Sequence, residues 1–177
     1  TVPMLPEALS SGVCSLLPGV DRLVQSVRLR VGPDGNLRES RFARSVIRSA
    51  GRLSYEDGAR MLSGAETGPV GKAVRTMAAA AALLAHARLR RGAMDLNLPE
   101  PVVTTDAEGN LLDARYGKRT DAHRLVEEFM LLANQAVAKR LRETGTAALH
   151  RVHDAPEEGR IDAFEALLAG FGERLRS

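Results

Sequence analysis

The first third of the chain alternates between apolar and polar side chains, which predicts a pair of strands. Residues 23–31 place most of their apolar side chains on one side of the alternation and the charged ones on the other, the period of two that is typical of a half-buried strand. The turn-forming sequence Gly-Pro-Asp-Gly-Asn follows at residues 32–36, and a second run continues to about residue 48. We therefore predict a β-hairpin over residues 23–48. Its polar face is expected to carry Arg28 and Arg30, joined from the second strand by some of Arg38, Arg41, Arg44 and Arg48.

Apolar positions three and four residues apart predict helices in the rest of the chain. Ser54 is the expected N-cap of a short helix over residues 55–62, because a serine side chain can accept from a free amide of the first turn. Alanine- and leucine-rich residues 70–91 predict a second helix, and residues 156–168 a last one. The clearest amphipathic pattern predicts a helix over residues 121–142. Its core face would comprise Ala122, Leu125, Val126, Phe129, Leu132, Ala133, Ala136 and Val137.

Shorter extended segments lie between these helices. Residues 94–103 and 111–115, joined by a turn at residues 105–110, predict a second small hairpin, and residues 148–152 predict a short strand. Strands and helices follow one another without a regular βαβ alternation, which favours an α+β fold over a doubly wound α/β fold.

The length of 177 residues suits a single domain. The longest apolar run, residues 77–85, is about half the length that a bilayer requires, so we expect no membrane span. No signal-peptide pattern opens the chain, and the single cysteine, Cys14, excludes an internal disulfide and a cysteine-based zinc site. We expect Cys14 to be a small buried side chain and the protein to be cytoplasmic. The proline-bearing start without a methionine suggests the interior of a longer chain.

The net charge of +3 conceals an uneven distribution. Residues 22–52 carry eight arginines against two acids, residues 71–92 carry five bases and no acid, and residues 93–113 carry five acids and no base. Because the planar guanidinium group suits phosphate oxygens, two basic segments are compatible with a polyanionic partner. A set of solvated arginine-rich faces is the alternative interpretation.

Candidate chemistry is sparse. His123 and Glu127 are four residues apart on the main predicted helix, a spacing that could hold a metal or pair with neighbouring bases. His150 and His153 lie at a predicted strand end, where they would point to opposite faces. No glycine-rich phosphate loop, catalytic triad or Cys-His pair is present. The residues alone therefore indicate an α+β protein with an arginine-rich hairpin.

Five segments, in order along the chain, carry further information. They are VPMLPEALSSGVCSLLPGVDR (2–22), SVIRSAGRLSY (45–55), RGAMDLNLPEP (91–101), DAHRLVEEFMLLAN (121–134) and RVHDAP (151–156). They cover most of the chain and comprise a proline-rich stretch, a hairpin exit, an extended segment, a central helix and a short motif before the last helix. Together they resemble the ribonuclease II / ribonuclease R family, in its RNB catalytic domain.

The resemblance implies a processive 3′→5′ exoribonuclease that hydrolyses single-stranded RNA to nucleoside 5′-monophosphates with magnesium. It implies an RNB-type fold of hairpins and mixed sheet flanked by amphipathic helices, of which residues 1–177 would be the central part of one catalytic domain. The metal-binding aspartates and the late arginine of the family would lie outside this segment. We therefore expect no catalytic or metal-binding residue within it and no activity from it alone. A non-catalytic RNA-binding module of the same fold is the alternative, and we expect a monomer in either case.

Three positions match functional positions of the family. Tyr55 matches a tyrosine that contacts RNA near its 3′ end, and Glu127 matches a glutamate implicated with it in reading the ribose. Leu96 stands where the family often has a phenylalanine that stacks on the terminal base, so the resemblance implies a weaker clamp here. Separately from the resemblance, the basic surface of the hairpin makes Arg28 and Arg30 candidates to line the path of an RNA backbone. The alternatives are a half-buried aromatic side chain at Tyr55 and a surface helix carboxylate at Glu127.

Overall fold

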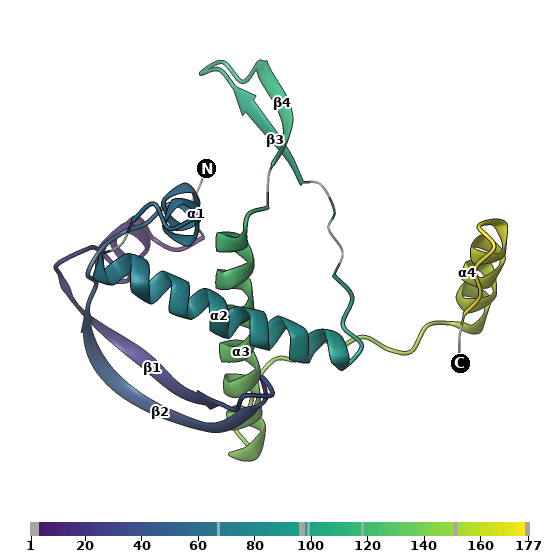
Figure 1. The fold of residues 1–177 in the computed structure, drawn as a ribbon, viewed down its shortest axis with the longest axis horizontal. Coiled ribbons are helices and arrows are strands. Elements are labelled where there is room, and N and C mark those ends of the chain that lie inside the picture. The colour runs from purple at the N-terminus through teal and green to yellow at the C-terminus, as the bar shows by residue number, and fades with distance from the viewer. Residues whose placement is uncertain are drawn as a thin grey trace. The chain divides into compact units, whose positions relative to one another are not determined.

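A computed structural model describes residues 4–66, 68–95, 98, 100–117, 119–150 and 152–175 of the chain. The described residues fall into two units, one over residues 1–140 and one over residues 141–177. Figure 1 shows the helices and strands that make up each of them. The elements are η1 (Ala8–Val13), β1 (Asp21–Val31), β2 (Leu37–Arg48), α1 (Tyr55–Leu62), α2 (Pro69–Arg90), β3 (Glu100–Thr105), β4 (Leu111–Gly117), α3 (Asp121–Glu143) and α4 (Glu158–Gly170).

The first hairpin forms as the alternation predicts. Strands β1 and β2 pair antiparallel, with Arg28 opposite Arg41. Because residues directly opposite each other share a face of the sheet, Arg41 joins Arg28 and Arg30 on one face. Arg44 and Arg48 lie on the other face, opposite Gln25 and Asp21. Only part of the expected arginine face is therefore continuous.

The turn of this hairpin packs closely against α2. Gly35 is buried and has a φ of +76°, a conformation that only glycine adopts readily. A Cβ atom at Gly35 would lie 2.4 Å from the carbonyl oxygen of Leu83 and 2.7 Å from the Cβ of Ala87. Arg90 of α2 donates to the carbonyl oxygen of Asp34 in the turn, at 2.8 Å. The glycine is thus required both by the turn and by the helix beneath it.

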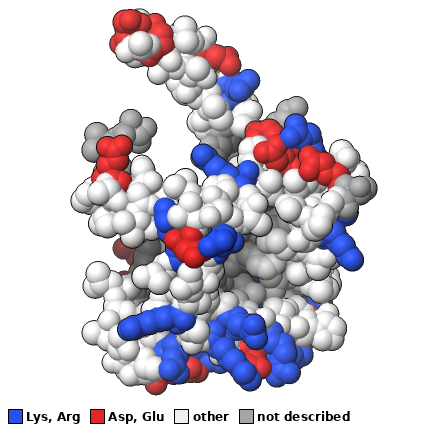
Figure 2. Space-filling view, turned by 90° about the vertical axis from the view of Figure 1, so that its left-hand side faces the viewer, with Lys and Arg blue, Asp and Glu red and all other residues white. Residues whose placement is uncertain are grey.

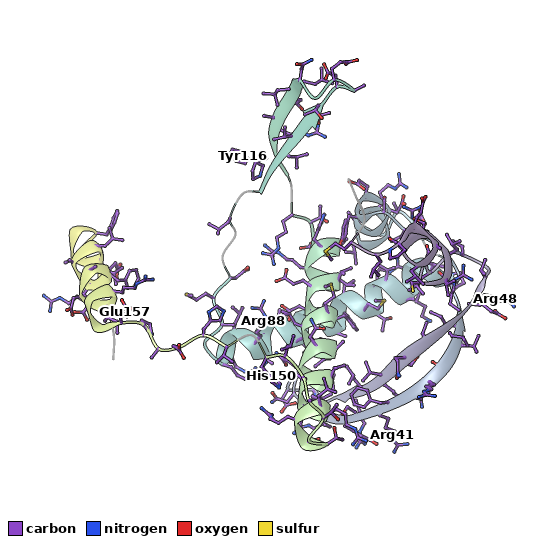
Figure 3. The ribbon with its side chains drawn as sticks, turned by 180° about the vertical axis from the view of Figure 1, so that it is seen from behind. Arg41, Arg48, Arg88, Tyr116, His150 and Glu157 are labelled. Atoms are coloured by element: carbon purple, nitrogen blue, oxygen red, sulfur yellow. The ribbon has the colours of Figure 1, made fainter. Side chains whose placement is uncertain are left out.

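Helices α2 and α3 cross, as Figures 1 and 3 show from opposite sides, and together with α1 they supply the core. Buried alanines on both helices allow this approach, since small side chains shorten the distance between helix axes. The buried apolar side chains are Met61, Ala81, Leu84, Ala87, Ala122, Leu125, Leu132 and Ala136.

The buried stripe of α3 is rotated relative to the face that periodicity predicts. Val126 and Val137 are 38% and 42% exposed, whereas Glu128 is buried at 6%. The reason is an ion pair across the helix crossing, in which Arg88 of α2 binds the Glu128 carboxylate with Nη2 at 2.7 Å and Nε at 3.0 Å. The ion pair thus keeps Glu128 in the buried stripe of α3, where hydrophobicity alone would place Val126 and Val137.

Other expectations have mixed outcomes. The second hairpin is confirmed, because β3 and β4 pair antiparallel. The strand expected over residues 148–152 is wrong. Its described residues, 148–150 and 152, are not in a strand, and Leu149 is fully exposed without a partner strand. The expected burial of Cys14 is also wrong: it is exposed, directly after η1, a helix with no buried residue.

The protein has an α+β fold, with helices mixed among two small antiparallel sheets. Among the described helices, none combines the length and the apolar character that a membrane span needs.

Candidate functional site

Tyr55 is the first residue of α1, and a reciprocal cap fixes its position. Ser54 Oγ accepts from the amide of Asp57 at 3.1 Å, and Asp57 Oδ2 accepts from the amide of Ser54 at 2.9 Å. The backbone and hydroxyl groups of Ser54 donate to the Asp57 carboxylate and hold its pKa below the ordinary value. This capping box confirms the helix start that the sequence predicts. It leaves the Tyr55 side chain 44% exposed.

The ring of Tyr55 stacks on the ring of His123, near the start of α3. The ring centroids are 3.7 Å apart and the planes are inclined by 15°. Three residues after Tyr55, Gly58 of α1 is buried near Ala122 of α3, where a Cβ atom at Gly58 would lie 3.1 Å from the Cβ of Ala122. The close approach of the two helices is what allows the rings to meet.

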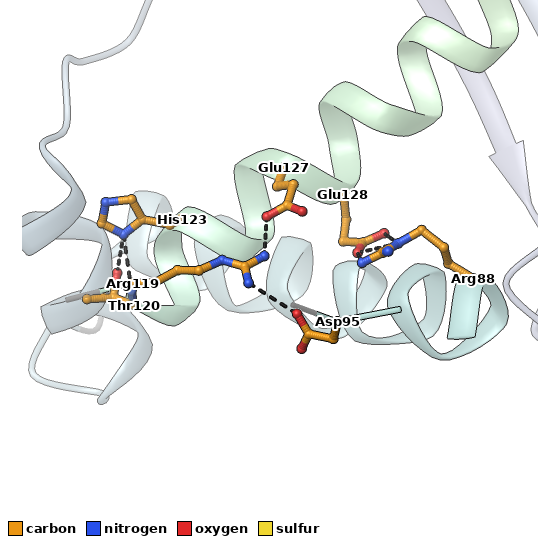
Figure 4. A network of polar contacts seen from close by, with 7 residues as sticks. All are labelled: Arg88, Asp95, Arg119, Thr120, His123, Glu127 and Glu128. Carbon is orange, nitrogen blue, oxygen red and sulfur yellow. Dashed lines mark hydrogen bonds and ion pairs between the residues drawn. The ribbon is translucent and has the colours of Figure 1, made fainter. Parts of the chain in front are cut away.

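Thr120 fixes the imidazole of His123 from the other side. Its amide donates to Nδ1 at 3.2 Å, and its hydroxyl oxygen lies 2.8 Å from the same nitrogen. Figure 4 shows this contact beside the neighbouring charged residues. His123 is therefore engaged by Tyr55 and Thr120, which favours a role in the protein's own structure over the metal couple with Glu127.

Glu127 lies one turn further along α3 and is held by Arg119. The Arg119 guanidinium binds Glu127 with one nitrogen and Asp95 with the other, the latter at 3.1 Å (Figure 4). The hydrogen bonds that Arg119 donates, to Glu127 most strongly and then to Asp95, raise its pKa above its already high ordinary value. Glu127 is a charged, oriented carboxylate that remains 41% exposed. It can therefore accept a hydrogen bond from a further donor.

Tyr55 contacts α3 through its stack on His123, which lies four residues before Glu127 on the same face of that helix. The structure thus links Tyr55, through His123, to the helix face that carries Glu127. The sequence does not single out Arg119 or Thr120. A threonine three residues before His123, directly ahead of the apolar periodicity, is the signal that could have indicated the N-cap.

The remaining candidate positions lie elsewhere. Leu96 is outside the described residues. Arg28 and Arg30 are exposed on β1, where Arg30 and Arg41 both bind Glu39 of β2. Figure 2 shows Lys and Arg side chains gathered at the lower edge of the face on view, where the hairpin lies, and Figure 3 labels Arg41 on that hairpin.

A hollow of about 490 Å³ between α2 and α3 adjoins the Arg119 network. Alanine side chains of α2 and Leu125 of α3 form its apolar part, and Arg119, Asp95 and Arg124 form part of its charged rim. In the described part of the chain, no three histidine, cysteine, aspartate or glutamate side chains converge in a way that could hold a metal ion.

Comparison of the sequence with known protein families identifies a match. The RNB domain model matches residues 1–176. Ribonuclease R of Chlamydia trachomatis serovar D is 35% identical over 97% of this chain and 25% of its own length. Ribonuclease R of Escherichia coli K12 is 34% identical over 98% of the chain and 22% of its own length. This chain thus spans about a quarter of the curated relatives it matches.

Solved structures agree with this assignment. Mycoplasma genitalium RNase R in complex with double-stranded RNA superimposes with a TM-score of 0.88 at 25% identity, over 96% of this chain and 31% of that protein. Dss1 exoribonuclease from Candida glabrata, in an active-site mutant, gives a TM-score of 0.68 at 19% identity over 89% of this chain and 21% of that chain, which supports the fold alone. The chain belongs to the RNB domain family.

Proposed function

We propose that this chain is the central segment of a catalytic domain that degrades single-stranded RNA processively from its 3′ end, releasing nucleoside 5′-monophosphates. Membership of the RNB domain family and similarity to proteins named ribonuclease R support the proposal. The observation that carries it is the arrangement of an exposed tyrosine ring and an oriented, exposed carboxylate on one side of the α1–α3 junction.

These two groups suit the recognition of a ribonucleotide. The exposed part of Tyr55 can contact a base or sugar near the 3′ end, since aromatic side chains bind single strands without regard to sequence. The Glu127 carboxylate can accept from a 2′-hydroxyl, the group that distinguishes RNA from DNA. Arg119 donates to the carboxylate and limits its rotation, so part of the orientation is set before RNA binds.

The hairpin arginines suit the phosphate backbone. Arg28 has no ion-pair partner among the described residues, while Arg30 shares Glu39 with Arg41. Arg28 and Arg41 lie directly opposite each other, and like charges in that position are unfavourable unless an anion approaches. We infer that Arg28 is the stronger phosphate contact of the two predicted arginines, and that Arg30 contributes less.

Magnesium, which the family resemblance implies, is not accommodated by the described residues, because they bring no suitable set of ligands together. The function proposed for this segment is RNA positioning, with the metal ligands for hydrolysis supplied from outside its described residues.

A direct test compares the 177-residue chain with the full-length protein on end-labelled single-stranded RNA in the presence of magnesium. We expect the full-length protein to release mononucleotides stepwise from the 3′ end and the 177-residue chain to release none. Glu127→Ala and Tyr55→Ala in the full-length protein should impair degradation. A full-length protein that binds RNA but never shortens it would contradict the enzymatic proposal and support the non-catalytic RNA-binding module.

A further inference from the structure

We propose that His123 is a positioning residue, which fixes the ring of Tyr55 relative to Glu127 at the site. The inference rests on the proposed function for its consequence on RNA, but its geometry stands independently. Three observations carry it: the stack with Tyr55, the double hydrogen bond to Thr120, and the close helix contact at Gly58.

The hydrogen bonds fix the imidazole before the stack is considered. A backbone amide can only donate, so the 3.2 Å contact from the Thr120 amide requires Nδ1 to carry no proton. The Thr120 hydroxyl, 2.8 Å from the same nitrogen, is then also a donor. Nδ1 of His123 is therefore the acceptor, and one edge of the ring is anchored to the N-terminus of α3.

The anchored ring then restricts Tyr55. At a centroid separation of 3.7 Å and an inclination of 15°, one face of the phenol is covered by imidazole. Tyr55 is still 44% exposed, so part of the residue can meet a ligand. Tyr55 and Gly58 are three residues apart on α1 and so lie on the same side of it. The close approach of Gly58 to Ala122 therefore fixes where along α3 the Tyr55 ring meets the His123 ring.

The helical spacing links this stack to Glu127. His123 and Glu127 are four residues apart on α3, which is about 6 Å along the helix axis. A ring stacked on His123 is thus held beside the residue that lies about one turn before Glu127. Without His123, the Tyr55 side chain would retain only its own rotamer preferences and its distance from Glu127 would vary.

Two substitutions separate this role from simple helix capping. His123→Asn retains an acceptor close to the position of Nδ1 and removes the ring face. His123→Phe retains a ring face and removes the acceptor. A residue that only caps α3 would be replaced well by asparagine, whereas a residue that positions Tyr55 would be replaced well by phenylalanine.

The first measurement needs no RNA. The chain contains only two tyrosines, Tyr55 and Tyr116, so the 177-residue chain with Tyr116→Phe has a single tyrosine whose ring protons can be followed by NMR. Stacked rings displace each other's proton resonances upfield. We expect this displacement to persist in His123→Phe and to be lost in His123→Asn. Retention of the displacement in His123→Asn would overturn the proposal.

The second measurement uses the full-length protein on single-stranded RNA. We expect His123→Asn to raise KM about two- to tenfold, the range that corresponds to loss of one aromatic pair, with kcat little changed, and His123→Phe to stay within about twofold of the parent. In a Tyr55→Ala background, His123→Asn should add nothing, because it acts through Tyr55. The positioning role would be contradicted if the effects of His123→Asn and Tyr55→Ala on KM were additive. It would also be contradicted if His123→Phe raised KM while His123→Asn did not. If Tyr55→Ala leaves RNA degradation unchanged while the NMR displacement behaves as expected, the proposed function of Tyr55 fails and the geometric inference stands.

Discussion

Two adjacent glutamates on α3 have different surroundings. The side chain of Glu128 is 7% exposed and pairs with Arg88 of α2, which is 21% exposed. The side chain of Glu127 is 41% exposed and pairs with Arg119, which is 28% exposed and also binds Asp95. A rotation of about 100° per residue separates the two carboxylates on the helix. One faces the helix crossing and the other faces the side that carries His123.

The difference indicates how this fold divides structural and functional work. Burial has removed most of the water around Glu128, and three hydrogen bonds from the Arg88 guanidinium compensate for that loss. Removal of Glu128 therefore leaves Arg88 without this partner in a largely buried position. Glu127 retains solvent access, so its removal costs the fold little and its oxygens stay available to a ligand. Because the two glutamates are adjacent and chemically identical, the sequence does not predict which one is buried and which one stays exposed.

The largest expected effect is on stability, from Glu128→Ala. Breaking a buried ion pair by removing one partner costs about 3–5 kcal/mol, and we expect about 3 kcal/mol because Arg88 keeps some solvent access. Glu127→Ala should change the free energy of unfolding by less than about 1 kcal/mol, as is usual for exposed pairs. Chemical denaturation of both variants measures the difference.

A matched double variant sharpens this prediction. Arg88→Met with Glu128→Leu replaces both charges by apolar side chains of similar size, and such replacements are often neutral or stabilising. We expect the double variant to recover most of the stability that Glu128→Ala loses. Equal destabilisation by Glu127→Ala and Glu128→Ala would remove the distinction between the two sites.

A smaller effect concerns the salt dependence of RNA binding. Each phosphate contact to a single strand contributes about −0.7 to the slope of log K against log salt concentration. Arg28→Ala in the full-length protein should reduce the magnitude of the slope by about this amount, and Arg30→Ala by less, because Glu39 already partly neutralises Arg30. If the slope is unchanged in both variants, these arginines do not contact phosphate and only form a solvated face.

The smallest effect is expected from acid at the start of α1. The pKa of Asp57 is lowered by the amide and hydroxyl of Ser54 and, less strongly, by Arg60. A carboxyl group with a lowered pKa in the folded state stabilises fully above its unfolded pKa, and the contribution disappears as the pH falls through the lower, folded value. We expect the cap to weaken only below about pH 4.

The Ser54→Ala variant tests this origin of the pKa shift. Carbon-13 NMR titration of the Asp57 carboxyl should give a pKa that moves up toward the ordinary value, though not all the way, since the Ser54 amide still donates. An unaltered Asp57 titration in this variant would mean that the hydroxyl plays no part in the shift.

Local patterns were sufficient for much of the fold. The hairpin alternation, the Ser54 cap and the periodicity of α3 each depend on residues close in sequence, and each predicted its element within a few positions. Failures occurred where tertiary contacts decide. Glu128 is buried because Arg88, 40 residues earlier, crosses over it, and no periodicity contains that information.

The candidate site was predicted in part. Family resemblance selected Tyr55 and Glu127, but it did not indicate what holds them. The stack on His123 and the bridge from Arg119 to Asp95 join residues that are 68 and 24 positions apart. These are consequences of how α1 meets α3, which becomes visible only in three dimensions. The role of Leu96 in RNA contact remains a prediction from the resemblance.

The most direct test of the account is the ratio of degradation rates on matched single-stranded RNA and DNA, measured for the full-length protein and its Glu127→Ala variant, with Tyr55→Ala alongside. If Glu127 accepts from the ribose 2′-hydroxyl, a DNA substrate forfeits a hydrogen bond to a charged acceptor that is worth about 1.5–3 kcal/mol, and removal of the carboxylate should narrow the RNA preference by roughly 10- to 150-fold. Tyr55→Ala should narrow it in the same direction while weakening binding. Equal losses on RNA and DNA in Glu127→Ala would show that this carboxylate serves the fold as Glu128 does, and the ribose-reading role would have to be withdrawn.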